Sequence, residues 1–161
     1  EPLFPANTGN IARTCAGTNT ELHLIKPLGF STDDKHMKRA GLDYWDKVKI
    51  TYHDDLREFV STVPDISKLY LVSKFASRDY TDVDYTADGD HYFLFGKETT
   101  GLPEEFMRRY PENAIRIPQN DNNIRALNLS NSAAIVIYEA LRQQSFPNLA
   151  RVHKYHFDKL K

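Results

Sequence analysis

The sequence predicts a single α/β domain with a mainly parallel sheet flanked by helices. Short apolar runs with strand character alternate with helix-like segments along all 161 residues, which is typical of this class. No linker or low-complexity tract divides the chain, so we expect one domain over residues 1–161. Three glycine- and asparagine-rich junctions each look like a tight turn that leads into a helix. Open α/β proteins bind small ligands at such turns, so we expect the three to form one composite site.

The junctions are short and well separated. The first runs from Pro5 to Arg13, the second from Phe95 to Pro103, and the third from Ile117 to Asn131. The second and third follow apolar, strand-like runs. Turns of this kind expose backbone N–H groups and small side chains at one edge of a sheet.

The first helix is expected at residues 8–19. Asn7 or Thr8 can cap its N-terminus, and Ile11 and Cys15 lie on one face at i,i+4 spacing. Asn7 therefore has two possible roles, as a cap or as a site residue.

The remaining elements follow from periodicity and from the positions of Pro and Gly. Further strands are expected at Leu22–Ile25, Val48–Tyr52, Lys68–Val72, His91–Phe95 and Ala114–Ile117. Further helices are expected at Asp33–Ala40, Leu56–Val63, Pro103–Arg109 and Asn128–Gln144. Residues 73–90 are polar and rich in Asp, which indicates a long loop.

The final helix has an unusual surface. Residues 133–138 are apolar nearly all round, and such a helix must be covered on more than one side. The cover is either a second subunit or the rest of the same chain.

The net charge of −1 excludes a protein that coats nucleic acid by bulk charge. Any contact with RNA must use local basic patches. The candidates are Lys35, Lys38, Arg39, Arg125, and Arg151 and Lys154 in a basic tail at residues 148–161. The alternative is that these are ordinary solvated side chains.

The single cysteine, Cys15, excludes an internal disulfide and favours a cytoplasmic location. Its apolar neighbours indicate a core residue rather than a nucleophile. No apolar run approaches the length of a membrane span, and the histidines lack a convincing ligand spacing, so we expect neither membrane nor metal. Phosphate-loop, dinucleotide-binding and hydrolase-elbow motifs are absent from the sequence.

Read together, the junctions resemble the knotted SPOUT methyltransferases. Asn7, Gly9, Ile11 and Arg13 match that family's Asn-x-Gly-x-Ile-x-Arg motif. Residues 95–102 match its Phe-Gly-x-Glu-x-x-Gly-Leu loop, and residues 127–131 match its Leu-Asn-Leu-Ser-Asn segment. The block from Arg39 to Tyr44 is similar to the small single-domain branch that methylates a ribose at the tRNA anticodon wobble position.

The resemblance implies a C-terminal trefoil knot and a homodimer that completes the active site. It also implies an additional strand just before Glu1. The expected activity is methyl transfer from S-adenosyl-L-methionine to the 2′-hydroxyl of cytidine or modified uridine at the wobble position of leucine isoacceptors, with S-adenosyl-L-homocysteine as product. A related enzyme for another RNA site and a catalytically silent RNA-binding dimer are the alternatives.

The resemblance also implies roles for individual residues. Arg13 is the expected catalytic group, with Asn7 and Tyr138 as further candidates. Cofactor contacts are expected from Val72, Ser73, Phe95, Gly96, Glu98, Gly101, Ile117, Pro118, Gln119, Ala126, Leu127, Asn128, Ser130 and Asn131. Glu98 could orient the loop or hold a ribose hydroxyl, and Asn128, Ser130 and Asn131 could simply cap the last helix.

Overall fold

The computed structural model of the protein describes residues 1–33, 35 and 44–152. The helix expected at Asp33–Ala40, with its end at Gly41, lies almost wholly outside these residues. Among the described helices, none is long and apolar enough to cross a bilayer.

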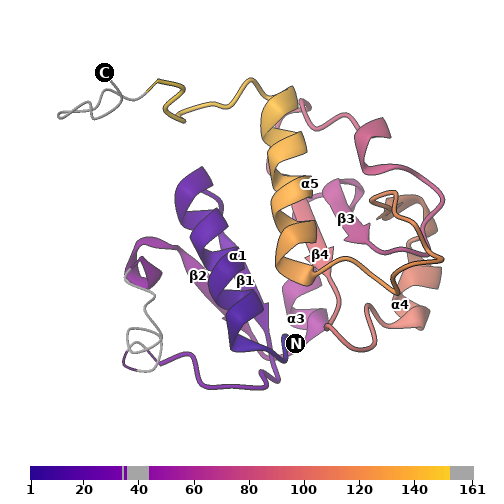
Figure 1. Ribbon diagram of the computed structural model, residues 1–161, viewed down its shortest axis with the longest axis horizontal. Coiled ribbons are helices and arrows are strands. Elements are labelled where there is room, and N and C mark those ends of the chain that lie inside the picture. Colours follow the sequence, from indigo (N-terminus) through magenta and orange to yellow (C-terminus); the bar gives the residue numbers. More distant parts are fainter. Residues whose placement is uncertain (34, 36–43, 153–161) are drawn as a thin grey trace.

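The strands form two parallel sheets (Figure 1). In the first, β1 (Leu22–Ile25) pairs with β2 (Ile50–His53). In the second, β3 (Leu69–Val72) lies between β4 (Tyr92–Phe95) and β5 (Ala114–Ile115). The α/β class with parallel strands is therefore confirmed.

Helices cover these sheets. The α-helices are α1 (Pro5–Thr18), α3 (Leu56–Ser61), α4 (Glu104–Arg109) and α5 (Leu129–Gln143). Short 3-10 turns occur at Trp45–Lys47, Ile66–Lys68, Tyr80–Asp82 and Pro111–Asn113. The helices α1 and α5 pack side by side in front of the strands (Figure 1).

The first helix begins earlier than expected. It starts at Pro5, with Phe4 in the cap position, and it ends at Thr18, followed by Asn19 as a C-cap in the left-handed conformation. Proline suits the first helical position, because its φ is already helical and its missing N–H would have no partner there. The expectation that Asn7 or Thr8 caps this helix is therefore wrong, since both lie inside it.

The fifth strand is shorter than expected. It stops at Ile115, and the backbone of Arg116 pairs instead with the segment around Asp79. That pairing anchors the long loop after β3, whose Tyr85 is fully buried. Tyr85 packs with Tyr70 of β3 and Val136 of α5. The loop therefore contributes to the main core, which local composition did not reveal.

The central strand β3 places side chains in two different core clusters. Leu69 and Leu71 pack on one side with Phe59, while Tyr70 packs on the other with Val136. This alternation is expected of a parallel strand buried on both faces. It fixes α5 against the face of β3 opposite to α3.

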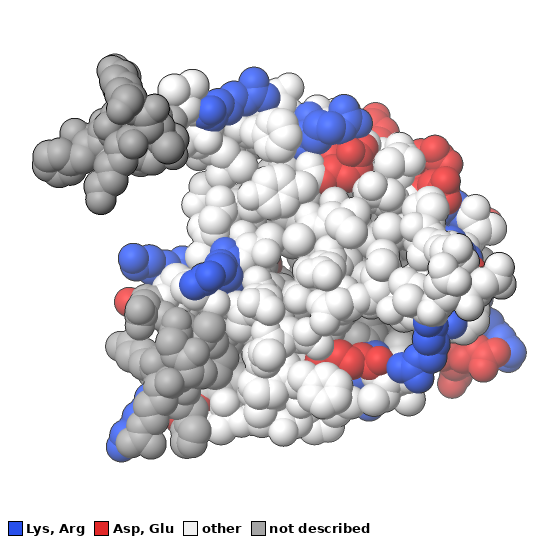
Figure 2. Space-filling view, in the orientation of Figure 1, with Lys and Arg blue, Asp and Glu red and all other residues white. Residues whose placement is uncertain are grey.

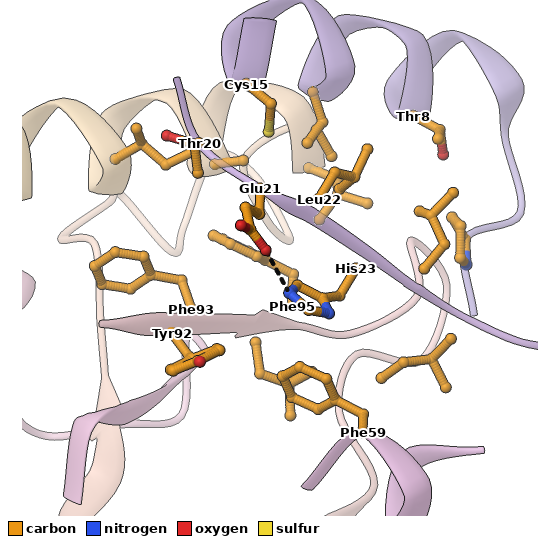
Figure 3. A pocket seen from close by; sticks show the side chains of 18 of the residues that line it. Thr8, Cys15, Thr20, Glu21, Leu22, His23, Phe59, Tyr92, Phe93 and Phe95 are labelled. Atoms are coloured by element: carbon orange, nitrogen blue, oxygen red, sulfur yellow. Dashed lines mark ion pairs between the residues drawn. The ribbon is translucent and has the colours of Figure 1, made fainter. Parts of the chain in front are cut away.

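A cavity of about 400 Å³ separates the two sheets. Figure 3 shows side chains of β1, β4, α1 and α3 converging on it, including Leu22, Phe93, Cys15 and Phe59. β1 pairs only with β2, and β4 pairs only with β3, so the edges facing this cavity are unpaired in the described residues. The strand ahead of Glu1 and the C-terminal knot stay predictions.

Candidate functional site

The carboxyl ends of β3, β4 and β5 meet at a second cavity, of about 570 Å³. Val72 and Phe95 end their strands at its wall, and Ile117 follows β5. Ligands of open α/β folds bind at this edge. The volume lies in the range of small-molecule sites.

All three sequence junctions reach this cavity. The candidate residues that line it are Asn7, Val72, Ser73, Phe95, Gly96, Glu98, Gly101, Ile117, Gln119, Arg125, Ala126, Leu127 and Asn128. Pro118, Ser130 and Asn131 are not part of the lining. The expected convergence of the junctions on one place is therefore seen in the structure.

Asn7 joins the three junctions by hydrogen bonds. Its side-chain Nδ2 donates to Glu98 Oε1 at 3.1 Å, and its Oδ1 accepts from Asn128 Nδ2 at 3.0 Å. These partners lie 91 and 121 residues away along the chain. The network ties the start of α1 to both loops of the cavity.

The carboxylate of Glu98 points toward the start of α1. It accepts hydrogen bonds from the backbone N–H of Leu3 at 2.9 Å and of Phe4 at 3.2 Å, in addition to Asn7. Burial alone raises the pKa of Glu98, but hydrogen bonds from backbone and side-chain donors outweigh it and leave the pKa below its ordinary value. These contacts favour the loop-orienting role over contact with a ribose hydroxyl.

Glycine is required at two positions of the second junction. A Cβ at Gly96 would collide with the carbonyl carbon of Gly101 and the backbone nitrogen of Leu102. Gly101 itself has φ +72°, a left-handed conformation that favours glycine. Its N–H donates to the Lys97 carbonyl at 2.9 Å, which closes the turn.

The third junction ends in a helix cap. Asn128 Oδ1 accepts from the backbone N–H groups of Ser130 and Asn131, and also from the Ser130 hydroxyl at 2.6 Å. The capping role is therefore real for Asn128. Its amide nitrogen remains available for the bond to Asn7, so it serves both purposes.

The lining combines apolar walls with polar groups at defined points. Val72, Phe95, Ile117, Leu102 and Leu129 supply apolar surface, whereas Ser73, Glu98, Gln119 and Asn128 supply donors and acceptors. This mixture suits a ligand with a flat base and polar substituents. The residues present therefore fit an adenosine-containing cofactor.

Arg13 lies on an exposed face of α1 and does not line either cavity. Its guanidinium carbon is 5.0 Å from the ring centroid of Tyr44, whose hydroxyl donates to the Gly9 carbonyl at 2.7 Å. Within the described part of the chain, Arg13 has no ion pair.

Tyr138 also lies outside both cavities. It is 49% exposed and Ile135 is 36% exposed, while Val136 and Ile137 on the opposite side of α5 are buried. Tyr138 is therefore not a core residue, and the alternative that this helix is covered wholly by its own chain is wrong. Figure 2 shows that the face carrying α1 and α5 has few charged side chains in its middle.

The candidate RNA-binding residues are dispersed. Arg125 lies at the cavity, with its Nη2 donating to the Glu98 carbonyl at 3.2 Å. Lys35 and Arg151 are exposed, and Arg151 lies over the ring of Phe146. Lys38, Arg39 and Lys154 lie outside the described residues.

Cys15 is a core residue, as its neighbours suggested. It is buried in α1, and desolvation raises the pKa of its thiol to about 11. A protonated, inaccessible thiol is a poor nucleophile. The described residues contain no cluster of His, Cys, Asp and Glu suited to a metal ion.

Nine residues of the lining were not among the candidates. Five of them belong to the second and third junctions, namely Lys97, Thr99, Thr100, Leu102 and Leu129. The other four lie outside the junctions. They are Phe4, Lys74, Phe75 and Ser132. Lys74 and Phe75 directly follow a buried strand, and that position is a signal for site residues in parallel sheets. Treating 73–90 as an undivided loop obscured it.

Several known proteins are similar to this chain in sequence. The sequence profile of the SpoU rRNA Methylase family matches residues 1–138. A Lactococcus lactis subsp. cremoris protein, provisionally named a tRNA (cytidine(34)-2′-O)-methyltransferase, is 62% identical over 162 residues, covering 100% of this chain and 96% of the relative. The tRNA (cytidine(34)-2′-O)-methyltransferase of Methylovorus glucosotrophus is 46% identical, covering 91% of this chain and 93% of its own.

A solved structure described as giving insights into 2-OH methylation of C/U34 on tRNA is 38% identical, with a TM-score of 0.79. It covers 89% of this chain, which in turn spans 91% of that chain. The profile match extends over more than half of the sequence and includes all three junctions up to Tyr138. The chain belongs to the SpoU methylase family.

Proposed function

We propose that the protein is an S-adenosylmethionine-dependent methyltransferase that acts on the 2′-hydroxyl of the wobble nucleotide of tRNA. The observation that carries this proposal is the Asn7 network, which joins three motifs of a methylase family around one cavity. The names of the two relatives and the subject of the solved structure support position 34 as the target.

The reaction requires alignment and proton removal. S-adenosylmethionine, when bound, would supply an activated methyl group on a positively charged sulfur. The ribose oxygen would form the new C–O bond as the C–S bond breaks, and the hydroxyl proton would pass to solvent water. The cavity walls hold the donor, and the Glu98 and Asn128 contacts fix the loops that position it.

Arg13 contributes to the alignment of the ribose. A guanidinium remains protonated in proteins, so it is a poor general base. It can instead bind the phosphate next to the target ribose in a bidentate manner and hold the hydroxyl in line. Tyr44 keeps the guanidinium on the exposed face of α1, where a phosphate can reach it.

A homodimer would bring Arg13 and Tyr138 to the cavity. Both residues are exposed and outside the lining of their own chain, and the exposed apolar stripe of Ile135 and Tyr138 needs cover. A two-fold pairing through α5 would bury this stripe and carry Arg13 of one subunit toward the cavity of the other. Pairing would also double the basic residues that face RNA.

The choice of target nucleotide and of tRNA isoacceptor is inferred from the resemblance to the methyltransferase family. We infer that cytidine and modified uridine in leucine isoacceptors are the targets. The tRNA substrate and the reduced, buried Cys15 support a cytoplasmic location.

The test has two parts. Calorimetric titration with S-adenosylmethionine should give one site per subunit. The labelled methyl group should then appear in a leucine anticodon stem-loop, and a matched RNA with 2′-deoxyribose at the wobble position should accept none. Methylation of the deoxy control would place the reaction at another atom. Absence of cofactor binding by a folded dimer would favour a catalytically silent RNA-binding protein.

A further inference from the structure

An exposed phenyl ring lies at the cavity. Phe75 is 83% exposed, although burial of a phenylalanine side chain is worth about 1.5–3 kcal/mol. It belongs to the turn that follows β3 and lines the cavity together with Lys74. A large apolar side chain left in water beside a binding cavity indicates a contact with something outside the chain.

The backbone around Phe75 is held firmly. The carbonyl of Lys74 accepts a hydrogen bond from Arg116 Nη1 at 2.7 Å, and Ala76 is buried in the core. The Phe75 N–H donates to the Ser73 hydroxyl at 3.3 Å. The ring is therefore presented from a fixed turn, and its exposure does not come from a loosely held loop.

One cation lies over the ring, and a second lies at the same cavity. Lys74 Nζ lies 5.1 Å from the ring centroid and donates to the Arg125 carbonyl at 3.0 Å. Arg125, from the loop before α5, lies on the same cavity. An exposed aromatic ring close to positive side chains at one cavity has the chemistry that proteins use for unpaired nucleotides, with stacking on the base and attraction for the phosphates.

We propose that Phe75 stacks on a base of the substrate RNA loop and so holds the target ribose at the cavity, with Lys74 and Arg125 contacting the neighbouring phosphates. This inference rests on the proposed function, because it assumes an RNA substrate. Stacking on a base needs no hydrogen bonds, so Phe75 would contribute affinity without choosing between cytidine and uridine. Anticodon-loop bases are single-stranded and can be splayed out for such a contact.

The experiment distinguishes aromatic stacking on a base from a general apolar contact. Steady-state methylation of an anticodon stem-loop is measured at saturating S-adenosylmethionine for the wild type, Phe75→Ala, Phe75→Leu and Phe75→Tyr. Stacking on one base is worth about 1–3 kcal/mol, so KM for RNA should rise about 5- to 150-fold in the Ala variant. Leu should resemble Ala, and Tyr should resemble the wild type.

A matched variant and two further measurements distinguish base stacking from damage to the fold or to the cofactor site. Ile66→Ala removes an exposed apolar side chain that lines neither cavity, and KM should not change. Cofactor affinity and oligomeric state should be the same in all Phe75 variants. An unchanged KM in Phe75→Ala would overturn the inference, as would weaker cofactor binding or loss of the dimer. If the wild type itself methylates no RNA, the proposed function fails instead.

Discussion

The side-chain amide of Asn7 donates a hydrogen bond to the carboxylate of Glu98 at 3.1 Å. The two residues come from different motifs, one at the start of α1 and the other in the loop after β4. Through this contact the helix that bears Arg13 is fixed relative to the loop that lines the cavity. The geometry of the site therefore depends on a few polar contacts between segments far apart in sequence.

The substitution Glu98→Gln should destabilise the protein and weaken cofactor binding. A neutral amide oxygen cannot replace both carboxylate oxygens, which accept bonds from Leu3, Phe4 and Asn7. Loss of these bonds should cost about 1–3 kcal/mol of unfolding free energy in urea denaturation. The control is Glu104→Gln, whose exposed pair with Arg108 should contribute less than about 1 kcal/mol. Equal effects of the two substitutions would contradict the role of Glu98.

The contribution of Glu98 should disappear in acid. Its pKa is lower in the folded protein than its ordinary value of about 4.3, so the ionised form favours folding. The difference in unfolding free energy between the wild type and Glu98→Gln should be fully present above the ordinary pKa. It should decline as the pH falls through the folded pKa. Denaturation curves at several pH values test this, and a difference that grows on acidification would show the opposite linkage.

The substitution Gly96→Ala should abolish cofactor binding. Its Cβ would collide with the backbone of Gly101, so the second loop must move away from the cavity. Gly17→Ala is the matched control, because a Cβ there meets nothing within 4 Å and alanine is the better helix former. Calorimetry with S-adenosylmethionine should show no binding for the first variant and normal binding for the second. Circular dichroism is the control measurement that checks whether both variants are folded.

Mixing two inactive variants should restore activity if the site is shared between subunits. Arg13→Ala leaves the cavity intact, and Gly96→Ala leaves Arg13 intact. In a mixed dimer, one site then combines an unaltered cavity with an unaltered arginine from the partner. Random reassortment should recover about a quarter of the wild-type methylation rate. If the mixture recovers no methylation activity, Arg13 acts in its own chain.

A strand inserted between β1 and β4 should join the two sheets and stabilise the protein. Among the described residues the facing edges are unpaired, the cavity between them is lined mainly by apolar side chains, and Thr8 there is 1% exposed. Its hydroxyl has no hydrogen-bond partner in the described part of the chain. A chain extended before Glu1 by a strand-length apolar segment should melt several degrees higher. The same extension with a proline at its centre should raise the melting temperature less, because proline lacks the N–H that a central strand must donate to its neighbour.

The sequence predicted the class of fold and the convergence of its three junctions, because both follow from local signals. Alternating apolar runs indicate strands, and glycines such as Gly96 and Gly101 mark turns that only glycine fits. The resemblance to a family then supplied the candidate lining residues.

Other features of the structure could not be predicted from local sequence signals. The role of Asn7 depends on Glu98 and Asn128, whose proximity arises only when the strands assemble. The end of β5 depends on Arg116 pairing near Asp79. Phe75 looked like an ordinary loop residue, because its exposure is a property of the folded turn.

The bond from Lys74 Nζ to the Arg125 carbonyl has a kinetic consequence. It links the loop after β3 to the loop before α5 at the cavity, through one half-buried lysine side chain and one backbone carbonyl. Side chains of this kind change rotamer in picoseconds to nanoseconds, whereas domain hinges move in microseconds to milliseconds. Exchange of cofactor for its demethylated product can then proceed by side-chain opening alone, so product residence time should be set by affinity and not by a hinge.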